Sequence, residues 1–454
     1  MEQIHLIAVG GSAMHNLAIA LKRKGYHVTG SDDEIFEPSK SRLAHEGLLP
    51  DEMGWNAESI HKHLSAVIVG MHARPDNQEL ARAHELKIPV YSYPEYLYNQ
   101  ASDKKRLVVC GSHGKTTITA MILHVLNELN VNTDYMVGAQ LDGFDCMVSL
   151  SDAPLMVLEG DEYLSSPEDR RPKFLHYQAD LAILSGIAWD HINVFPTYEE
   201  YEHQFELLME QLQQKNARLV YNAEDEEIIA LVKRYPQVDA LPYYTPKYKV
   251  KNGKTTAEIN GKKYPLNVFG AHNLQNMAGA QLLCQQIGVS QDDFYTAIGS
   301  FTGAAKRLER VLETDNFAMY KDFAHSPSKL KATTSAFKAQ FPDRKMTACM
   351  ELHTFSSLNH TFLQEYAGSM NTADNAIVYF NPHTIAHKKL AAISKQDVQD
   401  AFKSENLMVL TDKEELVSFL KKQDWNNHNL LMMSSGNFDG LSFENLGQEL
   451  INQD

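Results

Sequence analysis

The sequence predicts an α/β protein of three domains, and three observations support this prediction. Short apolar segments typical of buried strands alternate with helical segments along most of the 454 residues. A glycine-bearing turn joins one such strand to a helix soon after residue 107. A short stretch of antiparallel character interrupts the alternation near residues 244–270. We therefore expect a Rossmann-like N-terminal domain (residues 1–103), a P-loop ATPase-like central domain with a small antiparallel appendage (104–310) and an α/β C-terminal domain (311–454).

The N-terminal segment has the pattern of a dinucleotide-binding βαβ unit. A strand over residues 4–9 precedes Gly10-Gly11-Ser12-Ala13-Met14, a helix and a second strand that ends in Asp32. Asp32 lies 22 positions after Gly10, as an acidic ribose ligand would. The glycine pattern is incomplete, so both NAD binding and a plain sheet turn remain open. Further strands at residues 66–70 and 88–91 complete the predicted domain.

The central domain begins with a candidate phosphate loop. Gly111-Ser112-His113-Gly114-Lys115-Thr116-Thr117 lies between a strand over residues 107–110 and a helix over 119–129. Glycines let backbone N–H groups turn inward, the helix N-terminus attracts anions, and a lysine adds a full positive charge. The spacing is shorter than the full P-loop pattern, because Val109 replaces the first glycine. The turn predicts nucleotide binding, with an ordinary strand-to-helix turn as the alternative.

Two later strands end in residues suited to a metal ion. The strand over residues 155–158 ends at Glu159, and the strand over 181–187 is followed by Asp190 and His191. The carboxyl ends of parallel strands meet at one edge of a sheet, and Mg²⁺ prefers oxygen ligands. We therefore expect Glu159 and His191 to reach a metal held by the Thr116 hydroxyl, although each residue alone is more often structural or solvated.

The appendage and the C-terminal domain have their own signals. Asn252-Gly253 and Asn260-Gly261 predict tight turns between short antiparallel strands. A long helix follows, with His272, Asn273 and Asn276 in its first turn, where amides can reach a purine ring; helix capping is the alternative for Asn273. Strands of the C-terminal domain are predicted to end at Tyr320 and to cover residues 346–350, 376–380, 407–410 and 430–433.

Composition excludes several classes of protein. The net charge of −16 argues against a general nucleic-acid surface. The chain contains no apolar run of 18 residues and no secretory signal, so we expect a soluble, cytoplasmic protein without membrane insertion. The four cysteines are scattered, which indicates neither a zinc site nor a disulfide framework.

Six motifs occur in a fixed order, and together they resemble one family. They are Gly-Ser-His-Gly-Lys-Thr-Thr, Glu-Gly-Asp-Glu, Asp-His, His-Asn-Leu-Gln-Asn, Lys-Arg and Asp-Phe-Ala-His-Ser-Pro. Over essentially its whole length the chain resembles the Mur ligases, ATP-dependent amide-forming enzymes of peptidoglycan biosynthesis. The opening glycines then resemble the uridine-nucleotide site of the ligases that use UDP-N-acetylmuramate, rather than an NAD site.

The resemblance implies ATP and Mg²⁺ as cofactors and a role for each matching residue. The implied catalytic residues are Lys115, Glu159, His191 and Arg307, and the implied Mg²⁺ ligands are Thr116, Glu159 and His191. The implied ATP contacts are Gly111, His113, Gly114, Lys115, Thr116, Thr117, His272, Asn273, Asn276, Lys306, Arg307, Asp322 and His325. The implied UDP-N-acetylmuramate contacts are Gly10, Gly11, Ser12, Met14, Asp32, His72, Arg74 and Asn77, and the polar loop with His353 and Ser356 is expected to bind the amino substrate.

The implied reaction activates a carboxylate. ATP phosphorylates the muramyl carboxylate to an acyl phosphate, and an amine attacks it through a tetrahedral intermediate. Two branches of the family use UDP-N-acetylmuramate: one adds L-alanine, and the other adds the intact tripeptide L-alanyl-γ-D-glutamyl-meso-diaminopimelate. Tyr163, residues 169–177 and the ending at residues 434–440 resemble the tripeptide-adding branch.

Some residues depart from the family pattern. Ser326 replaces a second histidine, residues 351–354 lack an expected arginine, and no lysine lies between His191 and Lys215. Besides the L-alanine-adding ligase, a non-catalytic UDP-sugar sensor remains an alternative, which the presence of Lys115, Glu159 and His191 disfavours.

Overall fold

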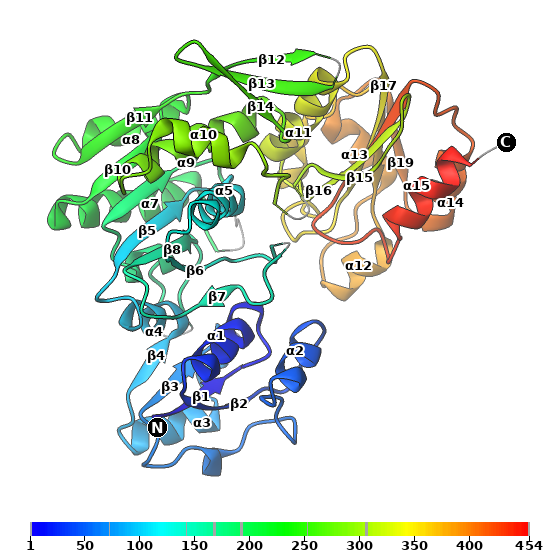
Figure 1. Ribbon diagram of the computed structural model, residues 1–454. Coiled ribbons are helices and arrows are strands. Elements are labelled where there is room, and N and C mark those ends of the chain that lie inside the picture. The colour runs from blue at the N-terminus through cyan, green and yellow to red at the C-terminus, as the bar shows by residue number, and fades with distance from the viewer. Residues whose placement is uncertain are drawn as a thin grey trace. The chain divides into compact units, whose positions relative to one another are not determined.

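The computed structural model describes residues 2–71, 73–141, 143–166, 169–190, 194–251, 253–304 and 307–452 (Figure 1). Contacts within the chain divide it into two compact units. The first unit comprises residues 1–187, 199–244 and 279–294, and the second comprises 188–198, 245–278 and 295–454. The boundaries of three domains at residues 103 and 310 therefore stay a prediction.

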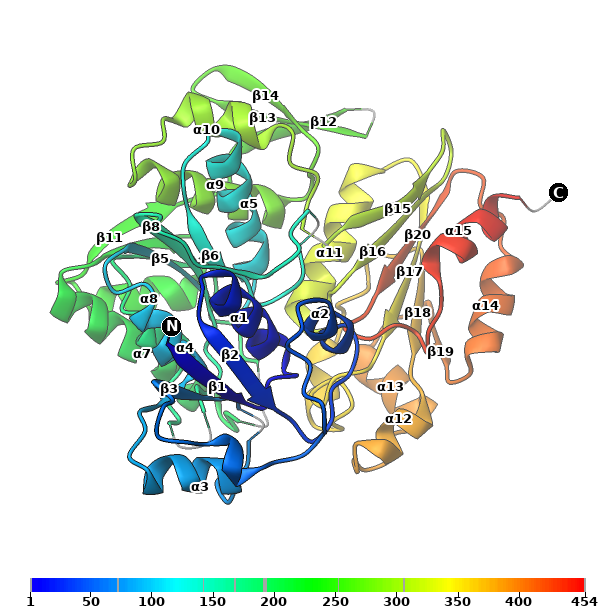
Figure 2. The same ribbon diagram turned by 60° about the horizontal axis from the view of Figure 1, so that its bottom comes forward.

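The first unit contains an N-terminal sheet whose strands are all parallel, in the order β2-β1-β3-β4. The strands are β1 (Gln3–Ile7), β2 (His27–Ser31), β3 (Ala66–Val69) and β4 (Val90–Ser92). Parallel neighbours require crossover connections, which here contain α1 (Ser12–Arg23), α2 (Ser39–His45), the 3₁₀ turn η1 (Ala57–Ser59) and α3 (Gln78–Glu85). Figure 2 shows α1 beside β1 and β2. This is the Rossmann-like arrangement that the sequence predicts.

The second sheet of this unit has seven strands in the order β11-β10-β9-β5-β8-β6-β7, and only the short β6–β7 pair is antiparallel. Its strands are β5 (Lys105–Cys110), β6 (Asp134–Met136), β7 (Val148–Ser149), β8 (Leu155–Gly160), β9 (Leu181–Leu184), β10 (Arg218–Asn222) and β11 (Asp239–Tyr243). The helices of this region are α4 (Tyr93–Asn99), α5 (Lys115–Glu128), α6 (Lys173–His176), α7 (Tyr198–Lys215) and α8 (Glu226–Arg234). Helix α5 packs along β5 and β8 (Figure 1). Because β5 lies between β8 and β9, the three strand ends that matter for the predicted site are adjacent.

The second unit opens with the predicted antiparallel appendage, a sheet of β12 (Lys247–Lys251), β13 (Lys254–Ile259) and β14 (Lys262–Leu266). At the second turn, Asn260 and Gly261 both have positive φ angles, +50° and +79°, as a type I′ turn requires. Asn252 of the first turn lies outside the described residues. Helices α9 (Ala271–Gln285) and α10 (Gln291–Ile298) follow, each with residues assigned to both units, and α9 begins where the sequence predicts.

The C-terminal sheet has the order β15-β16-β20-β17-β18-β19, and only the edge strand β15 is antiparallel to its neighbour. Its strands are β15 (Glu309–Glu313), β16 (Ala318–Asp322), β17 (Lys345–Glu351), β18 (Asn375–Tyr379), β19 (Leu407–Leu410) and β20 (His428–Met433). The other elements are α11 (Pro327–Gln340), η2 (Phe362–Tyr366), α12 (Pro382–His387), α13 (Lys395–Phe402), α14 (Lys413–Lys421) and α15 (Phe443–Ile451).

Both faces of this sheet are buried, each in its own hydrophobic core. Ala348 and Met350 of β17 pack with α11 and α13, whereas Cys349 between them packs with α14 and α15. Figures 1 and 2 show α11 on one side of the sheet and α14 and α15 on the other. Successive side chains of a strand alternate between faces, so a continuous apolar run is what a doubly covered strand needs.

The predicted fold class is confirmed, and the differences are local. The strand predicted over residues 181–187 ends at Leu184, because Ser185 and Gly186 turn to meet the phosphate loop. Strands β6, β7, β10, β11 and β15 were not predicted. In the part of the chain that the structure describes, no helix is long and apolar enough to cross a membrane.

Candidate functional site

The phosphate loop of the first unit is built by glycines that other residues could not replace. Gly111 has φ +133°, and a Cβ atom there would lie 2.4 Å from the Ser185 hydroxyl. Gly114 has φ +80° and caps the N-terminus of α5 without a side-chain contact. Left-handed conformations favour glycine, so these two positions allow the chain to pass from β5 into α5 within four residues. The positive N-terminal end of α5 therefore lies at the loop.

A threonine and a glutamate meet at the carboxyl end of the central strands. The Thr116 hydroxyl donates a 2.9 Å hydrogen bond to Glu159 Oε1, and the Gly138 N–H donates a 3.1 Å bond to Oε2. Burial raises the pKa of Glu159, although Lys115 and these two hydrogen bonds oppose the shift. Two hard oxygen donors, one anionic, fit Mg²⁺, which is held through one or two protein oxygens with water and phosphate completing the shell. The sequence correctly predicted that these two side chains lie together.

Lys115 is held by Glu162, a residue that no predicted role in the sequence had singled out. Its ammonium lies 2.5 Å from Glu162 Oε2 and 3.8 Å from Asp161, and the Tyr201 hydroxyl donates to Glu162 Oε1 at 2.9 Å. Burial disfavours the ammonium, but Glu162 and Asp161 more than offset this, so the pKa of Lys115 lies above its ordinary value. The lysine is therefore charged throughout the pH range of an assay. Glu162 is recognisable in sequence only as part of a motif, because its partner Tyr201 lies 39 residues later.

His113 has a structural position within the loop. Its ring lies against Gly186, where a Cβ atom would stand 1.9 Å from His113 Cε1. The Ser112 N–H donates to the Gly186 carbonyl at 2.8 Å, and the Ser112 hydroxyl lies 2.9 Å from His113 Nδ1. Gly186 therefore allows the end of β9 to approach the phosphate loop closely. No sequence signal singled it out.

A cavity of the first unit, about 520 Å³ in volume, lies at the end of β1 and β2. Its predicted members are Gly10, Gly11, Ser12 and Asp32. The Gly10 N–H donates a 2.7 Å bond to Asp32, and a Cβ atom at Gly10 would lie 2.9 Å from the same oxygen. Burial raises the pKa of Asp32, against the effect of that hydrogen bond.

Some lining residues of this cavity were not predicted, and some predicted residues do not line it. His15, Asn16, Arg42, Gly138 and Gln140 are among the added members. Met14 is buried on α1, Arg74 is exposed, and Asn77 caps α3 by accepting from the Glu79 and Leu80 N–H groups. Gly138 matters most, because it lines the cavity and also binds Glu159. Gly138 therefore links the lining of the cavity to the predicted metal ligand.

The second unit contains the other predicted nucleotide contacts. The Asn273 side-chain amide donates a 2.9 Å bond to the Phe269 carbonyl, which leaves its oxygen for another partner. Asn276 is buried one turn later on α9, and burial lowers the pKa of His272. His272 also lines a cavity of about 260 Å³ with residues of β12 and α11. These three residues lie at the start of α9, as predicted.

Asp322 organises the segment around Arg307. Its carboxylate accepts from the Leu308 N–H at 2.6 Å and the Ala324 N–H at 2.7 Å. The Arg307 guanidinium lies over the Phe323 ring at 4.6 Å, a cation–π contact. His325 Nδ1 lies 2.8 Å from the Phe323 carbonyl, and the N–H on that nitrogen donates to it. Asp322 thus positions the backbone beside Arg307.

We expect His325 to stay neutral under assay conditions. Burial and the charge of Lys329 lower the pKa of His325 to about 4. Because the folded state binds this proton less readily than the unfolded chain, the contribution to stability is present above about pH 6.5 and is lost as the pH falls toward about 4. A ¹³C-histidine NMR titration should show one resonance with a midpoint near pH 4, and this resonance should be absent from His325→Gln. A midpoint near 6.5 would contradict the buried position.

The predicted amino-substrate loop follows β17. His353 Nδ1 lies 3.7 Å from Glu351, whose carboxylate accepts from the Ser434 hydroxyl and, at 2.9 Å, from the Phe438 N–H. Ser356 is partly exposed on the same loop. Lys388 lies over the exposed Phe355 ring at 4.5 Å. The structure therefore brings the loop, the Ser434–Phe438 ending and Lys388 into one region of the second unit.

Three predicted site residues, His72, His191 and Lys306, lie outside the described residues. Their proximity to the other site residues stays a prediction.

Comparison with protein families assigns successive parts of the chain to one family. Residues 3–105 match the model described as Mur ligase family, catalytic domain, and residues 109–284 match the Mur ligase middle domain. Residues 306–436 match the Mur ligase, glutamate ligase domain.

Similar curated proteins include both kinds of ligase that use UDP-N-acetylmuramate. The UDP-N-acetylmuramate–L-alanyl-γ-D-glutamyl-meso-2,6-diaminoheptandioate ligase of Haemophilus influenzae is 28% identical over 458 residues, covering 97% of this chain and 98% of the relative. The UDP-N-acetylmuramate–L-alanine ligase of Desulfitobacterium hafniense is 27% identical over 433 residues, covering 92% and 93%.

Solved structures show the same fold. A UDP-N-acetylmuramate–alanine ligase from Thermotoga maritima matches with a TM-score of 0.71 at 20% identity, over 99% of this chain and 98% of that chain. A murein peptide ligase from Psychrobacter arcticus matches with a TM-score of 0.63 at 20% identity, over 100% of both chains. At 20% identity, these matches establish only the similarity of fold.

Proposed function

Because the chain belongs to the Mur ligase family of ATP-dependent amino-acid ligases, which act in peptidoglycan synthesis, we propose that it joins UDP-N-acetylmuramate to L-alanyl-γ-D-glutamyl-meso-diaminopimelate. ATP binding and the use of a UDP-muramyl substrate with an amino-acid or peptide substrate follow from the family. The choice of the tripeptide over L-alanine is our proposal. So are the roles of individual residues and the domain boundaries after residues 103 and 310.

The position of Gly138 is the observation that best supports the reaction. Its N–H binds Glu159, the proposed metal ligand, and the same residue lines the cavity with Gly10 and Asp32. A uridine nucleotide bound through the glycine turn would therefore extend its sugar toward the phosphate loop. This is what phosphorylation of a sugar-linked carboxylate requires, because the reacting groups must meet in one dry site.

The residues of the first unit have complementary proposed tasks. Lys115 and the loop N–H groups bind the phosphates and stabilise the charge that develops on the transferring phosphoryl group. Thr116 and Glu159, with His191, would hold Mg²⁺, which supplies further positive charge to the phosphate oxygens when bound. Glu162 fixes the Lys115 ammonium, and Tyr201 fixes Glu162 in turn. The muramyl carboxylate of the substrate is thereby converted to an acyl phosphate, from which the attacking amine displaces phosphate.

The proposed ATP contacts in the second unit are His272, Asn273, Asn276, Arg307, Asp322 and His325. The amide oxygen of Asn273 is available to accept a hydrogen bond, because its NH₂ group donates to Phe269. The Arg307 guanidinium is held over the Phe323 ring, and Asp322 orders the adjacent backbone. We propose that Arg307 binds ATP phosphates and that the helix start of α9 recognises the base.

Two features favour the tripeptide over L-alanine. The segment between Glu159 and α6 is folded by its own contacts, including a bidentate Asp169–Arg171 pair, and it resembles the tripeptide-adding branch. The loop with His353 and Ser356 offers several hydrogen-bonding groups at the end of β17, which suits a substrate with several carboxylates. L-alanine ligation is the second candidate, because relatives with that activity are similar over almost the whole chain.

A phosphate-release assay with UDP-N-acetylmuramate and ATP tests this choice. We expect turnover with the tripeptide to exceed turnover with L-alanine, and we expect His353→Ala and Ser356→Ala to raise the tripeptide KM more than the ATP KM. Each change removes a hydrogen bond to a charged group, so a rise of about tenfold is expected. Robust ligation of L-alanine with none of the tripeptide would assign the protein to the alanine-adding branch.

His360→Ala is the matched control for these variants. His360 is a histidine of the same unit, 63% exposed and paired with Asp397 at 3.5 Å. It should leave both KM values unchanged. An equal rise in the tripeptide KM for His360→Ala and His353→Ala would indicate that the loop after β17 has no special role.

A further inference from the structure

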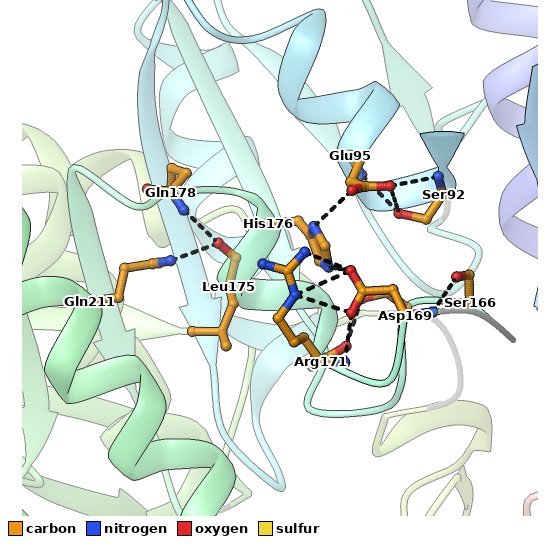
Figure 3. Close-up of polar contacts among 10 residues, drawn as sticks. Ser92, Glu95, Ser166, Asp169, Arg171, Leu175, His176, Gln178 and Gln211 are labelled. Carbon is orange, nitrogen blue, oxygen red and sulfur yellow. Dashed lines mark hydrogen bonds and ion pairs between the residues drawn. The ribbon is translucent and has the colours of Figure 1, made fainter. Parts of the chain in front are cut away.

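Three metal-ligating side chains of the first unit come together apart from the phosphate loop. Glu95 lies on α4, Asp169 lies in the segment before α6, and His176 ends α6. Figure 3 shows the His176 ring between the two carboxylates. One ring nitrogen and one oxygen of each carboxylate lie within 4.8 Å of one another, and no other such group occurs among the residues that the structure describes. None of the three has a role in the proposed ligase reaction.

The His176 imidazole is poorly satisfied in this position. His176 is 7% exposed, and its buried Nε2 has no hydrogen-bond partner. That atom lies 3.3 Å from Asp169 Oδ2, while Nδ1 lies 4.0 Å from Glu95 Oε1. A neutral imidazole has one N–H and one lone pair, so one of its nitrogens must present a lone pair toward a carboxylate. A buried arrangement of this kind is unfavourable unless a cation lies between the groups.

We propose that Glu95, Asp169 and His176 bind a divalent transition-metal ion, with Zn²⁺ as the representative, through His176 Nε2 and one oxygen of each carboxylate. Imidazole and carboxylate are ligands that Zn²⁺ accepts at about 2.0–2.2 Å in tetrahedral geometry, so ligand atoms lie about 3.4 Å apart. The His176–Asp169 separation already meets this requirement. Glu95 Oε1 lies 4.0 Å from the other ring nitrogen, Nδ1, so this side chain, which is 36% exposed, must move toward Nε2 when the metal binds.

The surroundings orient both carboxylates, as metal sites require. Arg171 donates to Asp169 through Nε at 3.0 Å and Nη2 at 2.6 Å. The Ser92 N–H and hydroxyl both donate to Glu95 Oε2 at 2.8 Å, which leaves Oε1 directed at His176. Such supporting contacts fix ligand geometry and raise affinity. Two carboxylates and one guanidinium leave a net negative charge to attract a cation.

The imidazole is suited to be a ligand rather than a charged partner. Burial lowers the pKa of His176, although Asp169 opposes the shift. Near neutral pH the ring therefore keeps a lone pair for a metal. Its nitrogen donor also favours Zn²⁺ and neighbouring transition metals over Mg²⁺ at this cluster.

Metal titration of the full-length protein tests the proposal. After chelator treatment, Co²⁺ is added in the presence of excess Mg²⁺, which occupies the Thr116–Glu159 position, and binding is followed by visible absorption with Zn²⁺ as the competitor. We expect about one equivalent of Co²⁺ to bind, and His176→Gln and Glu95→Gln each to weaken binding at least about tenfold. Glu95→Gln keeps an acceptor for Ser92, so it provides the test if His176→Gln does not fold.

His203→Gln is the matched control. His203 is an exposed histidine that lies 3.0 Å from Glu206 on α7. Among the described residues, this pair belongs to no group of three metal-ligating side chains. It should leave Co²⁺ binding unchanged. The proposal would be overturned if the unaltered protein bound no Co²⁺, or if His176→Gln and Glu95→Gln bound it as tightly as the unaltered protein. The cluster would then be a salt-bridge network.

Discussion

Replacing Lys115 with alanine is expected to lower ATP-dependent turnover at least about 10²-fold, because a preorganised donor to developing transition-state charge is typically worth that much. Lys115 is the charged group of the phosphate loop, and Glu162 and Tyr201 hold its ammonium in place. Lys173 cannot replace it, because the Lys173 ammonium is paired with Asp161 at 2.7 Å. The measurement is phosphate release with saturating substrates.

Lys105→Ala is the matched control for this prediction. Lys105 begins the same strand, β5, but is exposed, so its loss should leave turnover within about twofold of the unaltered protein. UDP-N-acetylmuramate binding by Lys115→Ala confirms that the variant is folded. Near-normal phosphate release from Lys115→Ala would remove the basis for the phosphate-loop assignment.

Glu159→Ala and His191→Ala are expected to raise the Mg²⁺ concentration needed for turnover sharply while UDP-N-acetylmuramate binding survives. Glu159 offers an anionic oxygen beside Thr116, and a Mg²⁺ site with few protein ligands depends strongly on each one. Substrate binding should persist because Glu159 does not line the cavity, although Gly138 loses its acceptor and a small effect through it is expected.

The pH dependence of the Mg²⁺ requirement gives a second readout. Burial raises the pKa of Glu159, so its carboxylate is protonated at a higher pH than an ordinary glutamate. The Mg²⁺ requirement of the unaltered protein should therefore increase as the pH is lowered, and Glu159→Ala should lose this dependence. Glu128→Ala, an exposed residue at the end of α5, serves as the control. If folded Glu159→Ala lost uridine-nucleotide binding as strongly as it lost Mg²⁺-dependent turnover, the metal site and the uridine cavity would not be separate.

The sequence by itself determined the fold class and the chemistry of the phosphate loop. Apolar runs, glycine turns and helix starts are local signals, so β5, α5, β8 and the Asn260–Gly261 turn could be predicted from their own residues. The meeting of Thr116 and Glu159 also followed, because parallel strands that end in polar residues place them at one edge. The missed strands β6, β7 and β15 are short, at a sheet edge, or weakly apolar, which makes their local signal poor.

Only the tertiary structure decided which distant side chains meet. The Tyr201 hydroxyl donates to Glu162, and Gly186 leaves space for the His113 ring. Gly138 binds Glu159 and also lines the cavity at the end of β1 and β2. The approach of Glu95 to His176 also joins segments about 80 residues apart. These pairs depend on the order of the strands and on the path of the connections between them, which sets long-range neighbours without leaving a periodic trace in the local sequence.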